Sequence, residues 1–461
     1  DFNKPLHIHF IGIGGISMSG LAEILLKEDF KISGSDAKPS DLVTHLESLG
    51  AKVYIGQRAS NITDDIELVI YTAAIHPDNP EFACAKEKQI PMLTRAELLG
   101  QIMRNYETPI AVSGTHGKTT TTSMISHILL EADADPTISV GGILPAIHGN
   151  IRVGESETFV TEACEYMDSF LNLKPKIEII LNIDSDHLDY FKDVEHIAKS
   201  FDKFARLVPE DGAVIAYDAN PFVKSVIDGL PNAITFGLNE SCDYYASDIN
   251  FDNDGMPEFD VNHGGRVLCR INLSIPGEHN ILNALSAFAC CHILGVDIDD
   301  IVNTLNKYTG TQRRFDVLGR TYNDIKIVDD YAHHPTEIKA TLSAIRNMKH
   351  NNLWCLFQPH TYTRTMALID DFATAFAEAD KIVLAEIYAA REKNIYKISS
   401  RTLMNKIKEA EPSKEVYFFE DFEEIANFVY NNAEEGDLVI TMGAGDISKV
   451  GEMILEKDRK F

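Results

Sequence analysis

A glycine-rich turn in the middle of the chain constrains its fold more than any other feature. The stretch reads Pro109-Ile-Ala-Val-Ser-Gly-Thr-His-Gly-Lys-Thr-Thr-Thr-Thr122, with a short apolar run before the turn. After the turn, over residues 119–131, apolar residues recur at helical spacing. A strand, a glycine turn and a helix that starts beside a lysine are typical of polyphosphate binding, because backbone N–H groups, the helix N-terminus and the ammonium all attract phosphate oxygens. The stretch therefore predicts a nucleoside triphosphate site.

The spacing of this turn differs from that of the usual phosphate loop. The usual pattern, G-x-x-x-x-G-K-[ST], would place a glycine at Val112, whereas the first glycine here is Gly114. A glycine turn that only joins a strand to a helix is the alternative. We expect Lys118 to contact the β- and γ-phosphates and Thr119 to ligate Mg²⁺. The predicted ATP-binding residues of the loop are Gly114, Thr115, His116, Gly117, Lys118, Thr119 and Thr120.

Length and charge limit the classes of function. With 461 residues, the chain is long enough for about three domains. The net charge of −28 argues against a nucleic-acid partner, because binding to a phosphate backbone needs a clustered basic surface. An anionic ligand must then be bound by a local device such as the glycine turn.

Signals for export and for membranes are not apparent in the sequence. It has no signal-peptide pattern and no apolar run near the ~20 residues of a membrane span, so we expect no membrane anchor. Seven cysteines are scattered without C-x-x-C pairs, which indicates neither a zinc site nor a disulfide framework. Cys164 is expected to be a small buried residue. These features favour a cytoplasmic protein, and they leave open whether it is a monomer or a homodimer.

The alternation of short apolar strands with helical segments predicts an α/β protein of three domains. Residues 1–106 predict a Rossmann-like N-terminal domain, residues 107–312 a central P-loop ATPase-type domain, and residues 313–461 a Rossmann-like C-terminal domain with a parallel sheet. Within the central domain, residues 243–276 alternate between polar and apolar side chains, which predicts antiparallel hairpins at one edge of the sheet.

A second glycine turn lies near the start of the chain, after the first predicted strand. It reads Gly12-Ile-Gly-Gly-Ile-Ser17, and an acidic residue, Asp36, follows the second strand. A dinucleotide fingerprint would have a third glycine or alanine in place of Ser17. The turn predicts a nucleotide diphosphate at the helix N-terminus, with Asp36 near a ribose or sugar hydroxyl. Glycines that serve only close packing of helix on strand are the alternative.

Carboxylates and a histidine follow two strands downstream of the phosphate loop. Because ligands of parallel sheets bind at the carboxyl ends of the strands, these side chains are expected near the triphosphate. We predict Glu162 and His187 as ligands of Mg²⁺, together with Thr119. Asp186 and Asp189 could instead be carboxylates at a helix N-terminus.

An arginine pair and a group of histidines mark the C-terminal domain. Arg314, in Gln312-Arg-Arg-Phe-Asp316, could neutralise charge during phosphoryl transfer, although a salt-bridged hinge is the alternative. The strand ends 329–334 and 360–364 carry three histidines and an arginine that could bind a carboxylate and an amine, whereas any one histidine could be structural.

Taken together, these motifs resemble the Mur ligases, the ATP-dependent amide-forming enzymes of peptidoglycan precursor synthesis and hence of cell wall biogenesis. The resemblance covers all three predicted domains and is closest to the branch that joins L-alanine to UDP-N-acetylmuramate. The segments that carry it are 9–15 (HFIGIGG), 18–23 (MSGLAE), 33–36 (SGSD), 114–120 (GTHGKTT), 162–165 (EACE), 182–187 (NIDSDH), 277–280 (GEHN) with Asn283, 313–319 (RRFDVLG), 330–337 (DYAHHPTE), 357–360 (FQPH), 362–365 (YTRT) and 387–392 (IYAARE).

The resemblance implies roles for particular residues. The UDP part of UDP-N-acetylmuramate would bind at Gly12, Gly14, Gly15, Ser17 and Asp36. ATP would bind the central domain with Asn283 near the adenine, and L-alanine would meet Tyr331, His333 and Arg364. Lys118, Arg314 and His187 would be catalytic. Two positions depart from family patterns: some members have arginine at the position of Thr361, and several use a carbamylated lysine, for which Lys199 and Lys203 lie near the expected segment.

The implied chemistry is a ligation through an acyl phosphate. A carboxylate is a poor electrophile until the γ-phosphate of ATP is transferred to it, after which an amine can attack. Three other functions would share parts of the pattern. They are a nicotinamide-dependent oxidoreductase, a related ligase that adds a preformed peptide or glutamate, and a non-catalytic nucleotide-regulated binding protein.

Overall fold

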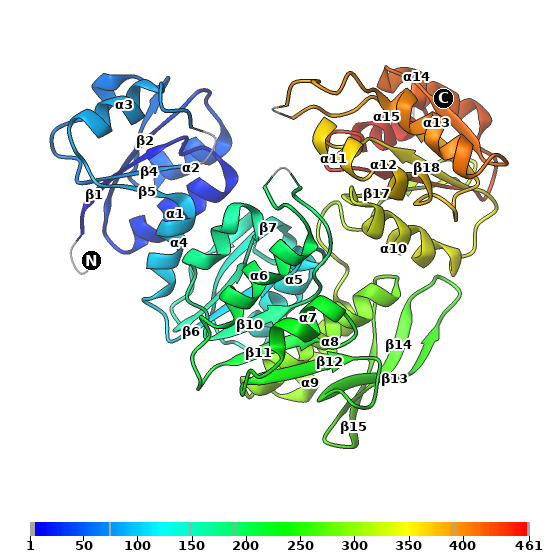
Figure 1. Cartoon of the computed structure of the whole chain (residues 1–461), viewed down its shortest axis with the longest axis horizontal. Coiled ribbons are helices and arrows are strands. Elements are labelled where there is room, and N and C mark those ends of the chain that lie inside the picture. Colours follow the sequence, from blue (N-terminus) through cyan, green and yellow to red (C-terminus); the bar gives the residue numbers. More distant parts are fainter. Residues whose placement is uncertain (1–4, 73–74, 148, 189, 391, 459–461) are drawn as a thin grey trace.

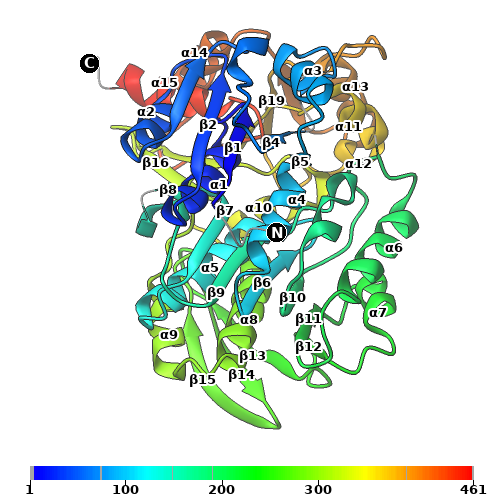
Figure 2. The ribbon, with the colours of Figure 1, turned by 90° about the vertical axis from the view of Figure 1, so that its left-hand side faces the viewer.

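The chain folds into three α/β bodies, each built on its own sheet (Figure 1). The computed structural model describes residues 5–72, 75–147, 149–188, 190–390 and 392–458. The N-terminal and C-terminal bodies both contact the central body, and Figure 2 shows them above it from the side. The predicted α/β class with three domains is therefore confirmed. Among the described residues, no helix is both long enough and apolar enough to cross a lipid bilayer.

The N-terminal sheet is parallel throughout, with strand order β3-β2-β1-β4-β5. The order reverses beside β1, and such a switch point is where open α/β sheets bind ligands. The glycine turn that follows β1 lies at this point. The elements are β1 (His7–Ile11), α1 (Ile16–Lys27), β2 (Lys31–Asp36), α2 (Asp41–Ser48), β3 (Lys52–Ile55), η1 (Ala59–Asn61), β4 (Leu68–Tyr71), α3 (Pro80–Glu87), β5 (Met92–Thr94) and α4 (Arg95–Met103).

The central sheet has ten strands, in the order β15-β14-β13-β12-β11-β10-β6-β9-β7-β8. The predicted hairpins are confirmed, because β13, β14 and β15 pair antiparallel at one edge. The strands are β6 (Thr108–Ser113), β7 (Thr137–Leu144), β8 (Gly149–Arg152), β9 (Thr158–Glu162), β10 (Ile177–Ile180), β11 (Ala213–Tyr217), β12 (Ala233–Gly237), β13 (Tyr244–Phe251), β14 (Pro257–His263) and β15 (Arg266–Asn272). The helices are α5 (Lys118–Glu131), η2 (Pro145–Ile147), η3 (Tyr166–Asn172), α6 (Val194–Ala205), α7 (Pro221–Ile227), α8 (Glu278–Ile293) and α9 (Ile298–Lys307).

Burial on both faces explains the apolar run that precedes the phosphate loop. β6 pairs in parallel with β10 on one side and with β9 on the other. Ile110 and Val112 are fully buried in a cluster with residues of α5 and α8, whereas Ala111 belongs to the cluster on the opposite face. Such continuous apolar strands are typical of parallel sheets covered by helices. The loop thus follows a strand that is buried on both faces.

The C-terminal sheet has the order β16-β17-β21-β18-β19-β20, and its first pair is antiparallel. The prediction of a wholly parallel sheet is therefore wrong at this edge. Only a short turn joins β16 to β17, and a parallel pair would need a much longer crossover. The elements are β16 (Asp316–Arg320), β17 (Lys326–Asp330), α10 (Pro335–Arg346), β18 (Leu353–Phe357), α11 (Tyr362–Ala367), α12 (Ile369–Ala373), β19 (Lys381–Leu384), α13 (Ser400–Ala410), β20 (Glu415–Phe418), α14 (Phe422–Asn432), β21 (Leu438–Met442) and α15 (Ser448–Asp458).

Candidate active site

The phosphate loop is fixed by glycine geometry and by the segment that follows β10. Gly114 and Gly117 have φ of +136° and +87°, in the region that favours glycine. A Cβ on Gly117 would lie 2.7 Å from Oδ1 of Asn283, so this position also needs glycine for space. Asn182 accepts the His116 backbone N–H at 2.8 Å and donates to the His116 carbonyl at 3.0 Å. The loop is thus held in shape by the protein itself.

The loop lysine is charged and bound by its own surroundings. Lys118 Nζ donates to the carbonyl of Gly114 at 2.5 Å and to Oε2 of Glu165 at 3.1 Å. Burial would lower the pKa of the ammonium, but the charge of Glu165 outweighs it and raises that pKa above its usual value. Lys118 therefore presents a fixed positive charge at the start of α5, where phosphate oxygens would meet it.

Glu165 links this lysine to the predicted metal ligand His187. The Glu165 side chain is 2% exposed, and its Oε1 lies 3.6 Å from Nε2 of His187. Sequence reasoning had not assigned Glu165 a role, although it lies in the same short segment as Glu162. The Glu162 carboxylate accepts the backbone N–H of Gly141 at 2.6 Å, and its charge also acts on Lys118. Carboxylate and hydroxyl oxygens suit Mg²⁺, and among the described residues the predicted ligand His187 has its ion-pair contacts with Glu165 and Asp186 rather than with Glu162.

Cys164, between these two glutamates, is exposed rather than buried as predicted. Its neighbours Ala163 and Glu165 are buried at the end of β9, whereas Cys164 is accessible to solvent. The surrounding protein still raises the pKa of the Cys164 thiol through desolvation. The prediction for Cys164 is therefore wrong.

A cavity of about 430 Å³ lies between the phosphate loop and the C-terminal body. A volume of several hundred cubic ångströms is typical of small-molecule sites. The lining of the cavity combines apolar side chains with His116, Gly117, Asn283 and Arg314. The apolar wall is formed by Tyr217, Phe222, Phe236, Ile275 and Leu282. The structure thus places the predicted residue Asn283 and the loop at one cavity that suits a purine nucleotide.

The two adjacent arginines have different surroundings. Arg313 donates to Asp329 at 2.9 Å and to the carbonyls of Gly443 and Gly445, so it matches the alternative of a salt-bridged hinge. Arg314 lines the cavity, and its guanidinium lies 5.2 Å from the Tyr331 ring centroid. Only the second arginine is therefore positioned to meet a bound ligand.

A second cavity of about 390 Å³ lies between His187 and the C-terminal body. Arg364 projects toward it, and its Nε donates to Asp186 at 3.1 Å while Nη1 lies 3.2 Å from the ring of His360. Burial would raise the pKa of Asp186, but the charge of Arg364 and neighbouring histidines hold it well below its usual range. Asp186 therefore pairs with Arg364 and does not lie at a helix N-terminus, since α6 is capped by Asp193. Asp189 lies outside the described residues.

Burial keeps the histidine of the predicted amino-acid site neutral. Desolvation lowers the pKa of His333 to about 4. Its Nδ1 lies 3.0 Å from the Tyr331 carbonyl, and its ring lies 6.0 Å from that of His360. Thr361 lines the same cavity with a φ of +68°. The predicted residues Tyr331, His333 and Arg364 thus gather near one another.

The two lysines considered for carbamylation lie on the surface of the central domain. Lys199 and Lys203 both lie on α6, and both are exposed.

The N-terminal glycine turn carries an additional cation that sequence reasoning missed. Asp36 accepts the backbone N–H of Gly14 at 2.9 Å, so its carboxylate holds the turn in shape. Arg95, the first residue of α4, donates from Nη1 to the Ser17 hydroxyl at 2.9 Å. Burial lowers the pKa of Arg95, and no carboxylate of the described residues lies within ion-pair distance of it. Arg95 directly follows β5 at the carboxyl edge of the sheet, and this position could have identified it as a ligand-binding residue from the sequence.

Comparisons with known proteins place these features in one family. Three family models match consecutive parts of the chain: "Mur ligase family, catalytic domain" at residues 7–107, "Mur ligase middle domain" at 112–291 and "Mur ligase, glutamate ligase domain" at 313–445. A UDP-N-acetylmuramate–L-alanine ligase of Agathobacter rectalis is 54% identical over 99% of each chain. The chain belongs to the Mur ligase family.

Other Mur ligases match over the same length. A UDP-N-acetylmuramate–L-alanine ligase of Acetivibrio thermocellus is 52% identical and covers 100% of this chain and 98% of its own. The crystal structure of the UDP-N-acetylmuramate–alanine ligase of Thermotoga maritima superposes with a TM-score of 0.80 at 28% identity, and covers 99% of both chains. A murein peptide ligase of Psychrobacter arcticus gives a TM-score of 0.71 at 25% identity, also over 99% of both. The predicted family membership is confirmed.

Proposed function

We propose that this Mur ligase joins the amino group of L-alanine to the carboxylate of UDP-N-acetylmuramate and consumes ATP in doing so. The identity of more than half of the residues to a ligase of that name, over nearly the full length, supports this substrate pair. The observation that carries the proposal is the series of contacts from Lys118 of the phosphate loop through Glu165 to His187, which lines the second cavity. One cavity suits a nucleotide and the other a small amino acid, so a carboxylate held between them could receive the γ-phosphate from one side and meet the amine from the other.

In the first step, a carboxylate oxygen of the sugar nucleotide attacks the γ-phosphorus of ATP, and the bond to the ADP oxygen breaks. Lys118 and Arg314 are positioned to neutralise negative charge that spreads over the phosphates. Thr119, Glu162 and His187 would hold Mg²⁺, with Glu165 beside them as a further candidate. The metal, when bound, would supply additional positive charge at the phosphates.

In the second step, the amine of L-alanine attacks the acyl carbon, loses a proton and displaces inorganic phosphate. Arg364 would bind the carboxylate of the amino acid through the part of its guanidinium that faces His360. A neutral His333 can accept a hydrogen bond from the ammonium through Nε2, because its Nδ1 faces the Tyr331 carbonyl. Closure of the C-terminal body would exclude water from the acyl phosphate.

The N-terminal body would bind the UDP part of the acceptor. Gly12, Gly14, Gly15 and Ser17 form the turn at the start of α1, where the positive end of the helix can attract a diphosphate. The N–H groups of the three glycines already donate to Ser35, Asp36 and Gly12, which fixes the shape of the turn. Arg95 adds the positive charge that its own surroundings leave unpaired. We propose that the reaction takes place in the cytoplasm, where peptidoglycan precursors would be made.

A ligase that adds a preformed peptide is the second candidate, because the Psychrobacter structure of that name shares the whole fold. The two candidate functions can be separated by a coupled assay that monitors ADP release in the presence of UDP-N-acetylmuramate. We expect ADP release that depends on L-alanine, and little with a tripeptide or with glutamate. A rate of ADP release with the tripeptide equal to that with L-alanine would support the second candidate. A rate that does not change when any of the acceptors is added would refute both candidates.

A further inference from the structure

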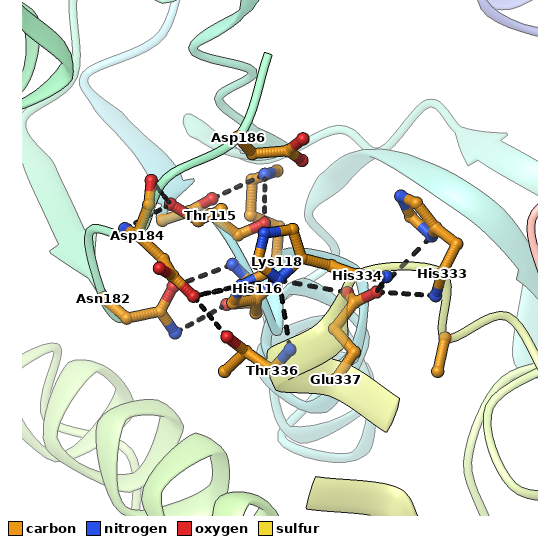
Figure 3. A network of polar contacts seen from close by, with 12 residues as sticks. Thr115, His116, Lys118, Asn182, Asp184, Asp186, His333, His334, Thr336 and Glu337 are labelled. Atoms are coloured by element: carbon orange, nitrogen blue, oxygen red, sulfur yellow. Dashed lines mark hydrogen bonds and ion pairs between the residues drawn. The ribbon is translucent and has the colours of Figure 1, made fainter. Parts of the chain in front are cut away.

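A single histidine of the phosphate loop contacts acidic groups from two domains. Nε2 of His116 lies 3.1 Å from Oδ2 of Asp184, which follows β10 in the central domain. Nδ1 lies 3.3 Å from Oε1 of Glu337, in the first turn of α10 in the C-terminal domain. Figure 3 shows the ring between the two carboxylates. The loop that would hold ATP is therefore joined to the neighbouring domain by a side chain of its own.

The N-terminus of α10 is built to complete this contact. Glu337 Oε2 accepts the backbone N–H groups of His333 and His334, so the carboxylate is fixed in place. His334 donates from Nε2 to the Ser185 carbonyl at 2.7 Å, and its Nδ1 accepts the Thr336 N–H. The Thr336 hydroxyl donates to Asp184 at 2.6 Å. The cap residue His334 and Thr336 of α10 thus contact the segment 184–185 across the domain boundary, and Glu337 contacts His116.

These side chains could be mistaken for a metal site, because His116, Asp184 and His334 offer ligand atoms within 4.8 Å of one another. Both ring nitrogens of His334 are already used in hydrogen bonds, one to Ser185 and one to Thr336. Both nitrogens of His116 face carboxylates, which suits two N–H donors and leaves no lone pair for a metal. The cluster is an ionic bridge.

We propose that His116 is a positioning residue that couples the phosphate loop to α10, an inference that rests on the proposed function. α10 forms one wall of the nucleotide cavity through Thr336, Ala340 and Thr341. His333, from the proposed amino-acid site, directly precedes the helix cap. The bridge therefore fixes the position of two groups relative to the phosphate loop: the α10 wall of the nucleotide cavity and the amine-binding His333.

The bridge depends on a proton on His116. Burial would lower the pKa of this histidine, but hydrogen bonds and charge from Asp184 and Glu337 raise it to about 9. The His334 ring, 4.7 Å away, is the other titratable group that faces it, while His333 and Arg314 act on Glu337. His116 is thus protonated below about pH 9 while the domains are in contact. Removal of either carboxylate would lower that pKa.

Two substitutions test the bridge, each with a matched control. His116→Asn keeps a polar side chain without the charge, and Glu337→Gln keeps the shape of the glutamate. His350→Asn and Glu378→Gln make the same changes in the C-terminal domain outside the network, at a turn and at an exposed ion pair with Arg346. We expect kcat to fall roughly 100-fold in His116→Asn and in Glu337→Gln, since misplaced groups cost about that much. KM for ATP should rise as well, because the bridge positions one wall of the nucleotide cavity. The controls should match the wild type.

The pH profile provides a readout that a purely structural role would not move. The wild-type rate should fall as the pH rises through about 9, because the bridging proton is then lost. In Glu337→Gln this fall should move to lower pH, and in His116→Asn it should disappear. The double variant should be no slower than the slower single variant, because both act on one contact. Unshifted profiles with additive losses would overturn the proposal.

Hydrogen exchange tests the same contact without any substrate. Backbone amides of residues 333–337 should exchange faster in Glu337→Gln and in His116→Asn than in the wild type, and the controls should not differ. If the wild type shows no ligase activity, the proposed function fails while exchange still tests the bridge. If the wild type is active and neither exchange nor the pH profile changes, the bridge alone is refuted. Should His116→Asn not fold, Glu337→Gln carries the same test.

Discussion

The two interfaces of the central domain are built from different chemistry. The N-terminal interface, α1 against β8 and α4 against η3, is apolar and tightly packed. Its core cluster runs without a break from Phe10 in β1 to Phe201 in α6. The C-terminal interface, the loop and segment 184–186 against α10 and Arg364, contains ion pairs and hydrogen bonds around two cavities, with a smaller apolar contact of Leu188 on the C-terminal core.

This difference indicates which interface can open. Apolar packing at near-crystalline density is costly to separate, because every lost contact exposes surface to water. Charged groups regain hydration when they separate, so a polar interface opens at a smaller cost. The N-terminal and central domains are therefore expected to behave as one body. The C-terminal domain is expected to move, as a ligase needs in order to admit ATP and L-alanine.

The largest predicted effect is at the phosphate loop, beside the polar interface. Lys118→Ala should lower kcat/KM by roughly 10²–10³-fold, the usual cost of removing a donor to developing charge. It should also lower stability, because Glu165 is left buried without its partner. The double variant Lys118→Ala/Glu165→Gln separates the two effects: thermal unfolding should recover while activity stays low. Activity that recovers with stability would contradict a catalytic role for the lysine.

Arg95 tests whether the apolar interface contains one functional charge. Arg95→Ala should raise KM for UDP-N-acetylmuramate about 10–100-fold, as expected for loss of a charge-assisted hydrogen bond of about 1.5–3 kcal/mol. KM for ATP and for L-alanine should stay the same. Arg58→Ala, an arginine elsewhere in the same domain, is the control. Equal changes in all three KM values would show that Arg95 serves packing rather than the acceptor.

Close backbone contact at the apolar interface leads to a stability prediction. A Cβ on Gly100, in α4, would lie 2.0 Å from the carbonyl oxygen of Asn172, so the backbone would have to shift. Gly100→Ala should destabilise by about 1–3 kcal/mol, measured by urea unfolding, although glycine to alanine usually stabilises a helix. Gly20→Ala is the comparison, because its Cβ would meet a side chain, that of Ile151 at 1.7 Å, rather than backbone. Stabilisation by Gly100→Ala would contradict the tight interface.

The sequence predicted those features that depend on short stretches of chain. The strand–loop–helix around Lys118, the first glycine turn and the hairpins of 243–276 all follow from local spacing, and the structure contains them. The edge strand β16 was missed, because a short segment with Gly319 gives little strand signal. Features that depend on distant residues could not be read in this way. Glu337 lies more than two hundred residues from His116, and Arg364 nearly as far from Asp186, so their pairing appears only in the folded chain.

The smallest predicted effect concerns how the two interfaces respond to mild acid. Burial lowers the pKa of His279, His333 and His360, all on or beside the polar interface, to about 4 from 6.5. Between these values an opened interface binds protons that the closed one does not. The share of closure stability that depends on these three histidines is therefore fully present above about pH 6.5 and is lost progressively as the pH falls toward 4. The share that depends on His116 has the opposite sign, because its raised pKa makes it fully present below about pH 6.5 and lost as the pH rises through about 9.

Hydrogen exchange read at both interfaces would measure this response. As the pH falls from 7 to 5, protection of residues 333–337 should decrease after correction for intrinsic exchange, while that of α4 should not. Asp184, Asp186 and Glu337 add nothing in this range, because their pKa values are held below normal and they stay charged. His360→Asn should make the protection of residues 333–337 less dependent on pH, because one of the three histidines that bind a proton on opening is removed. A parallel loss of protection in α4 would mean that the whole molecule unfolds with acid, and the proposed contrast between a fixed and an opening interface would not hold.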